Sequence, residues 1–129
     1  MSARIEDLEP VTQEKCNAFI VGAEGMGVPV RVTQTLRTMD QQGKLWAQGR
    51  TLPGPIVTKA KPGQSAHNFG MAFDICFAGK VPYPPESDPR WEQLGKLGES
   101  LGLAWGGRFK KFKDRPHFEQ PDWRRAAKK

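Results

Sequence analysis

The only two histidines of the chain, His67 and His117, stand among residues that could bind a metal ion. Asp74 follows His67 by seven residues. Two imidazoles and one carboxylate suit a catalytic zinc ion, because three protein ligands leave a fourth position open for water. Gly70 permits the tight backbone that would fold His67 toward Asp74. These residue types are consistent with one zinc ion bound by His67, Asp74 and His117.

A hydrolytic zinc site also needs a carboxylate that accepts the proton of the attacking water. Asp114 lies three residues before His117, and Glu119 lies two residues after it on the same strand face. Cys76 shares a strand face with Asp74 and could be a ligand, although a buried structural thiol is its commoner role. Spacing alone leaves open that both histidines are ordinary surface or capping residues, because nearby acids also occur by chance.

Periodicity and turn signals predict the elements that must position these residues. Thr38 is expected to cap a helix, with Gln41 in the capping-box position, and Asp88 to cap another. The first helix is expected to bury one face that consists of Val11, Cys16, Phe19, Ile20 and Ala23. The predicted helices span 11–25, 38–48 and 89–101, and the predicted strands span 28–35, 56–58, 71–77 and 116–119.

Helices and strands do not alternate regularly along the chain, which favours an α+β fold. We expect a small, mainly antiparallel sheet packed with about three helices. The length of 129 residues fits a single domain, 1–129, with a core at about 8–120 and a basic tail at 121–129. Two cysteines without a CxxC pair predict reduced thiols rather than a disulfide framework.

The chain carries a net charge of +6. A basic balance favours an anionic partner, although it also fits a surface that only keeps the protein soluble. The N-terminal residues contain no apolar stretch of the kind found in signal peptides, and no apolar run approaches the length of a membrane span. We therefore expect a protein that is made soluble in the cytoplasm.

The segments SAHNFGMAFD and WGGRFKKFKDRPHFE resemble a zinc peptidase superfamily. It contains D,D-carboxypeptidases, D-alanyl-D-alanine dipeptidases and phage L-alanyl-D-glutamate endopeptidases. The family pattern, S-x-H-x6-D followed by (D/E)-x-x-H, is matched by Ser65, His67, Asp74, Asp114 and His117. The resemblance implies that His67, Asp74 and His117 bind zinc and that Asp114 is the general base. It extends over roughly residues 8–120, and Asp rather than Glu at position 114 favours the phage endolysin branch.

The resemblance also implies roles in substrate binding. Arg37 would interact with the carbonyl that becomes an oxyanion or with a substrate carboxylate, and its alternative is a structural ion pair. Ser65 would bind near the substrate or steady the His67 loop, unless it only bonds its own backbone. Trp105 belongs to an aromatic cluster that could line the groove, although we expect Trp105 itself to be mostly buried.

The function implied by this resemblance is zinc-dependent hydrolysis of the L-Ala-D-Glu bond in peptidoglycan stem peptides, for host lysis by a phage. We expect no separate cell-wall-binding domain, a monomer and no nucleic-acid partner. The protein would be made in the host cytoplasm and act in the periplasm after a holin opens the inner membrane. The basic tail would touch the anionic outer-membrane surface weakly.

Two other functions remain open from the sequence. A D,D-carboxypeptidase that removes terminal D-alanine would use the same zinc ligands. A basic protein that binds an anionic polymer would carry only a structural zinc, whose fourth ligand would have to be Cys76 or Glu119.

Overall fold

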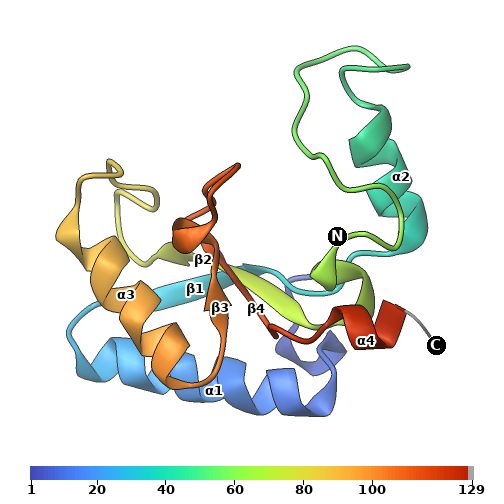
Figure 1. Ribbon diagram of the computed structural model, residues 1–129. Coiled ribbons are helices and arrows are strands. Elements are labelled where there is room, and N and C mark those ends of the chain that lie inside the picture. Colours follow the sequence, from blue (N-terminus) through green and yellow to red (C-terminus); the bar gives the residue numbers. More distant parts are fainter. Residues whose placement is uncertain (128–129) are drawn as a thin grey trace.

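An antiparallel sheet of four strands lies at the centre of the fold, with the strand order β1-β2-β4-β3 (Figure 1). This computed structural model describes residues 1–127. β2 pairs with both β1 and β4, so it is an inner strand. All three pairings are antiparallel, which confirms the predicted sheet. The strands are β1 (Val30–Gln34), β2 (Ala72–Phe77), β3 (Ala104–Trp105) and β4 (His117–Glu119).

Three helices occupy the positions that the sequence predicts, and short helical turns join them to the strands. The α-helices are α1 (Pro10–Gly25), α2 (Met39–Ala47), α3 (Pro89–Ser100) and the single turn α4 (Arg124–Ala127). The 3₁₀ turns are η1 (Ile5–Asp7), η2 (Ala66–Phe69) and η3 (Gly106–Arg108). None of the helices in the described chain is long and apolar enough to cross a membrane.

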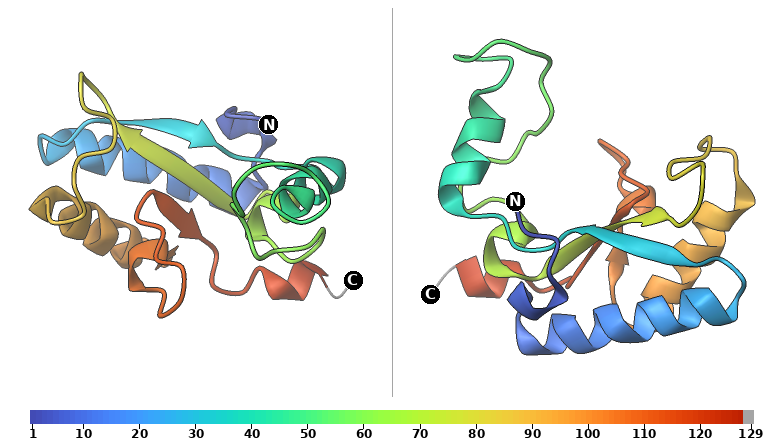
Figure 2. Two further views of the ribbon diagram at one scale, coloured as in Figure 1. Left: turned by 90° about the horizontal axis from the view of Figure 1, so that it is seen from above. Right: turned by 180° about the vertical axis from the view of Figure 1, so that it is seen from behind.

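α1 and α3 lie against one side of the sheet (Figure 2). Trp91 of α3 packs edge-on against Phe77 of β2, with ring centroids 4.7 Å apart. Phe19 of α1 packs against Phe73 of β2 and Phe118 of β4, with ring centroids 5.7 and 4.6 Å away. All three rings are fully buried. Along β2 and β4 the side chains alternate between faces, so the neighbours Asp74 and His117 point to the opposite side of the sheet.

Two details of the predicted elements are wrong. Val11 is half exposed rather than buried, because Thr12 occupies the inward position at the start of α1. Within residues 1–127 the predicted strand at 56–58 pairs with no other strand; it is irregular chain, and Ile56 and Val57 are exposed. β3 was not predicted, because two residues are too few to show a periodicity.

Residues 38–64, which we call the arm, stand off from the body of the molecule and include α2 (Figure 1). Thr38 caps α2 through the expected capping box with Gln41. Gln42 is fully buried, and its side-chain amide donates to the carbonyl of Ala60 at 2.7 Å. This bond ties α2 to the returning half of the arm.

The start of α1 is bonded to the end of η2, where the first histidine lies. The amide of Glu9 donates to the carbonyl of Gly70 at 3.0 Å. Gly70 has a φ of 66°, and a Cβ there would approach the Glu9 nitrogen to 3.0 Å. The position therefore requires glycine, as the sequence suggested. The Glu9 carboxylate caps α1 by accepting from the amide of Thr12 at 2.6 Å.

We predict that Glu9→Gln destabilises the protein by about 0.5–1 kcal/mol at neutral pH, because a charged N-cap is lost. Burial raises the pKa of Glu9, but hydrogen bonds from Thr12 and Val11 outweigh it and hold the pKa below its ordinary 4.5. A depressed folded-state pKa means that the stabilisation is present above pH 4.5 and is lost as pH falls through the folded value.

Urea unfolding at pH 7 and at pH 3 would test this prediction. The difference between wild type and Glu9→Gln should shrink at the lower pH. Glu14→Gln on the exposed side of α1 is the matched control and should change stability little at either pH. An unchanged difference at both pH values would contradict a role for the charge.

Candidate metal centre

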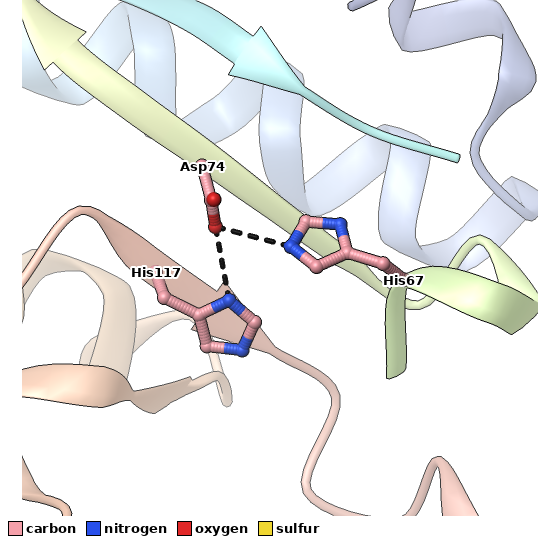
Figure 3. Close-up of side chains that lie close together, drawn as sticks. All are labelled: His67, Asp74 and His117. Atoms are coloured by element: carbon pink, nitrogen blue, oxygen red, sulfur yellow. Dashed lines mark hydrogen bonds and ion pairs between the residues drawn. The ribbon is translucent and has the colours of Figure 1, made fainter. Parts of the chain in front are cut away.

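Two histidines and one aspartate converge on the side of the sheet away from the aromatic core (Figure 3). Asp74 and His117 are direct partners across β2 and β4, and His67 comes from η2 just before β2. One potential ligand atom from each residue lies within 4.8 Å of the others, which makes them a possible metal-binding group. The structure thus brings together the three residues that the sequence singled out.

The spacing within this group suits a small cation. Asp74 Oδ1 lies 3.1 Å from His67 Nε2 and 2.9 Å from His117 Nδ1. Ligand atoms around a tetrahedral zinc ion, with bonds of about 2.0–2.1 Å, are about 3.3 Å apart. A cation could therefore replace the two hydrogen bonds with only small movements of the side chains.

The second nitrogen of each imidazole already has a partner. His67 Nδ1 lies 2.7 Å from the carbonyl oxygen of Thr35. A carbonyl oxygen can only accept a hydrogen bond, so Nδ1 must be the donor. His117 Nε2 lies 2.7 Å from a carboxylate oxygen of Glu119. Histidine ligands of metals usually donate their other N–H to an oxygen in this way, because the bond fixes the ring and its tautomer.

Burial and hydrogen bonding shift the pKa values of Asp74 and His117 in opposite directions. Burial raises the pKa of Asp74, but hydrogen bonds from both histidines lower it well below its ordinary range. Burial lowers the pKa of His117, but the hydrogen bonds to Asp74 and Glu119 raise it to about 10. His117 therefore carries a proton at neutral pH, which a metal ion would have to displace on binding.

Asp114 stands beside the group on the loop that leads into β4. Its amide donates to the carbonyl of Gly106 at 3.0 Å, and its own carbonyl accepts from the His117 amide at 3.1 Å. A Cβ at Gly106 would meet the Asp114 carbonyl, so glycine permits this close approach. In the described part of the chain no donor occupies the Asp114 carboxylate, which leaves it free for a ligand.

The pKa of the Asp114 carboxyl is raised, first by desolvation and then by the negative charge of Asp74. The positive charges of His117, His67 and Arg37 lower it in part. A raised pKa brings a carboxylate closer to the working range of a general base. Asp114 thus has both the free oxygens and the electrostatic environment that proton transfer requires.

Arg37 is held near the centre by neutral groups. Its guanidinium donates to the side-chain oxygens of Gln34 at 2.6 Å and Gln42 at 2.9 Å, while its Nε is buried without a partner. Burial lowers its pKa, and the charges of Asp74 and Asp114 raise it. No carboxylate of residues 1–127 lies within salt-bridge distance, so the structure does not show the alternative of a structural ion pair.

Ser65 and Trp105 have clearer structural positions. The Ser65 hydroxyl accepts from the His67 amide at 3.3 Å and caps η2, so it steadies the loop that carries this histidine. Trp105 is 4% exposed and its indole N–H donates to the carbonyl of Arg115 at 2.8 Å. The expected burial of Trp105 is confirmed, but a direct contact with substrate is a poor fit, because the ring lies in the core.

The remaining candidate ligands, Cys76 and Glu119, are not members of the metal-binding group. Cys76 is buried and does not belong to the metal-binding cluster found among the described residues, so it has the role of a structural thiol. Glu119 lies behind His117 and also accepts from the indole N–H of Trp123 at 2.9 Å. Glu119 is therefore placed to orient His117. The spacing in the sequence did not distinguish this role from that of a general base.

Trp123 corrects the expected boundary of the core. The sequence assigned 121–129 to a basic tail, but Trp123 is 4% exposed and packs with Ala66 and Ala72 in a second small core. α4 follows it directly. The last two tail residues, Lys128 and Lys129, lie outside the described residues.

A groove of about 910 Å³ opens beside the metal centre. It is bounded by part of the arm, by the loop 109–114 and by the segment 123–127, and it includes Asp114, His117 and Glu119. The ring of Phe109 lies 5.9 Å from that of His117. The sequence predicted a strand at 56–58 and did not predict that this part of the arm would be irregular chain that lines the groove.

Comparisons with known sequences identify relatives of this chain. A model of peptidase family M15, described as D-alanyl-D-alanine carboxypeptidase, matches residues 58–120. The peptidoglycan L-alanyl-D-glutamate endopeptidase CwlK of Bacillus subtilis (strain 168) is 35% identical over 122 residues, covering 88% of this chain and 73% of the relative. The L-alanyl-D-glutamate peptidase of a Listeria phage is 26% identical over 119 residues, covering 91% of this chain and 39% of the phage protein.

Solved structures share the fold at low sequence identity. The L-Ala D-Glu endopeptidase ChiX of Serratia marcescens has a TM-score of 0.66 at 22% identity, covering 95% of this chain and 86% of that one. The vancomycin-resistance D,D-pentapeptidase VanY in complex with Zn(II) has a TM-score of 0.65 at 16% identity, covering 95% of this chain and 79% of the VanY chain. With the identity and coverage of the Bacillus relative, these findings confirm the resemblance seen in the motifs: the chain belongs to peptidase family M15.

Proposed function

We propose that this chain is a zinc-dependent endopeptidase that hydrolyses the L-Ala-D-Glu bond of peptidoglycan stem peptides. The observation that carries the proposal is the convergence of His67, Asp74 and His117, with Asp114 beside them in an open groove. The Bacillus and phage relatives are named for this bond, and the VanY structure holds Zn(II). These names support both the substrate and the metal.

The donor set fits a catalytic zinc better than a structural one. Three ligands leave a fourth position open, and neither Cys76 nor Glu119 joins the described cluster to close it. A bound zinc ion would supply Lewis acidity, which activates water and polarises the scissile carbonyl. This open position argues against a protein that only binds an anionic polymer through a structural zinc.

Residues of this chain would accept the proton of the attacking water and stabilise the negative charge that develops on the carbonyl oxygen. Asp114 accepts a proton from the attacking water at its free carboxylate and passes it to the leaving amine. Arg37 faces no carboxylate partner among residues 1–127, so its guanidinium can bind the carbonyl oxygen as negative charge develops, or a carboxylate of the substrate. Ser65 fixes the loop of His67 through the amide of that residue.

Digestion of purified murein, followed by mass spectrometry of the products, would test both the metal and the bond. We expect new N-terminal D-glutamate and loss of the activity with a chelator, restored by zinc. The family model bears the description of a D-alanyl-D-alanine carboxypeptidase, which makes that activity the second candidate. Release of free D-alanine without new D-glutamate ends would favour it and refute the proposed bond.

Asp114→Asn separates proton transfer from metal binding in the same assay. The substitution removes the base but keeps the size of the side chain, so we expect turnover to fall by about 10²–10⁴-fold. Bound zinc, measured by elemental analysis, should stay at the wild-type level. Retained turnover would show that another group is the base.

Glu119→Gln tests whether the orientation of His117 supports the metal. Loss of the carboxylate behind a histidine ligand typically weakens metal binding by about 10–100-fold. We expect this loss in competition with a chromophoric chelator, for a variant that keeps the circular dichroism spectrum of the wild type. Glu24→Gln, on the exposed side of α1, is the matched control. Unchanged affinity in Glu119→Gln would contradict the positioning role.

The biological role we propose is lysis of a bacterial host for phage release, by a monomer that acts on the periplasmic wall. The basic tail would touch the anionic outer-membrane surface weakly, and no nucleic acid takes part. A holin-like partner would open the inner membrane. The relative from a Listeria phage supports the phage origin in this proposal.

Expression of the chain in a Gram-negative cytoplasm, without an added export signal, would test the dependence on a holin. We expect culture turbidity to fall only after a co-expressed holin or chloroform opens the inner membrane, with Asp114→Asn as the inactive control. Lysis at the same rate without membrane opening would contradict this dependence.

A further inference from the structure

We propose that Lys59, Lys111 and Arg124 form a carboxylate-binding rim around the groove, which selects stem peptides that carry a free carboxylate next to the scissile bond. This inference rests on the proposed function and adds a basis for substrate choice. The three side chains are exposed, and all three line the groove that contains Asp114 and His117.

The three cations come from different parts of the chain that meet at this groove. Lys59 belongs to the arm, Lys111 to the loop before β4, and Arg124 to α4. In Figure 1 the arm and the loop before β4 both rise on one side of the sheet, and α4 lies near the right-hand end of the sheet. A ligand lying in the groove would therefore meet positive charge from more than one direction.

These cations are not neutralised by the described part of the protein. No carboxylate in residues 1–127 lies within salt-bridge distance of any of them, whereas Arg90, Arg108, Arg115 and Arg125 all have acidic partners. Aromatic rings hold two of the three: Lys59 Nζ lies 4.3 Å from the centre of the Phe112 ring, and Arg124 Cζ lies 4.5 Å from that of Trp123.

Aromatic contacts fix a cation without using its hydrogen-bond donors. The Lys59 contact also joins the two walls of the groove, because Phe112 lies on the loop opposite the arm. Phe112 has a φ of 55°, an uncommon conformation for a residue with a side chain, and the residue is 63% exposed. An exposed ring in such a conformation is expected where a loop serves binding rather than packing.

Negative charge in the groove comes from two residues close to His117. The acidic lining residues are Asp114 and Glu119, and both carboxylate oxygens of Glu119 are engaged by His117 and Trp123. Apolar side chains, including Ile56, Val57 and Phe109, line the groove together with the cations. This distribution suits a short peptide with small apolar side chains and outlying carboxylates.

A stem peptide has this chemistry. Its D-glutamate is joined to the next residue through the side-chain carboxyl, so the α-carboxylate stays free beside the scissile amide. Conversion of that carboxylate to an amide removes one negative charge and changes little else. If the rim binds the carboxylate, the enzyme should discriminate between the two forms, mainly through KM.

The test uses two synthetic stem peptides that differ only in the α-carboxylate or α-amide of D-glutamate, with zinc-loaded enzyme. We expect the wild type to prefer the carboxylate form in kcat/KM by about five-fold or more, since each partly exposed charge pair contributes about two- to five-fold. The triple variant Lys59→Gln, Lys111→Gln, Arg124→Gln should lose most of this preference. Added salt should reduce the preference of the wild type.

Lys96→Gln on the exposed side of α3 is the matched control for charge and should keep the wild-type preference. Equal cleavage of the two peptides by the wild type would overturn the inference. So would a triple variant that loses activity on both peptides by the same factor, because that pattern shows damage to the groove without carboxylate recognition. If the wild type cleaves neither peptide, the proposed function fails, and this inference fails with it.

Discussion

The pairing of Asp74 with His117 across β2 and β4 is the interaction on which the rest of the site depends. A carboxylate that is removed from water is costly unless charged or polar donors surround it. Asp74 Oδ1 has a hydrogen bond to each of the two imidazoles. The neighbouring pair, Phe73 and Phe118, packs on the opposite face of the same two strands. A slip of one residue would exchange the two faces, so the aromatic core fixes the register of the metal centre.

Both ends of the chain support this centre through hydrogen bonds behind the histidines. Near the N-terminus, Ser2 accepts from the Thr35 amide at 2.8 Å, and Thr35 presents its carbonyl to His67. Near the C-terminus, Trp123 donates to Glu119, which holds His117. The two imidazoles are therefore oriented by segments that are far apart in sequence, and the short strand β4 alone would not fix its histidine.

The features that could be predicted from sequence were those with a local physical cause. The caps of α2 and α3 depend on Thr38 and Asp88 and their immediate neighbours, and both were confirmed. The ligand set depended on a spaced motif, since two histidines alone left other interpretations open. The packing of Trp105 could not be predicted, because it depends on Gly95 of α3, which is distant in sequence, and on Gly107, and both make room for the indole by lacking a side chain.

A single buried amide connects the outer wall of the groove to the chemistry inside it. Gln42 accepts from the Arg37 guanidinium and donates to the carbonyl of Ala60, the neighbour of Lys59. Gln42 is fully buried, so a movement of the arm that broke either bond would leave a polar group unsatisfied, at a cost of about 1–3 kcal/mol. The width of the groove and the position of Arg37 are therefore set together. A substrate that displaced the arm would also shift the Arg37 guanidinium.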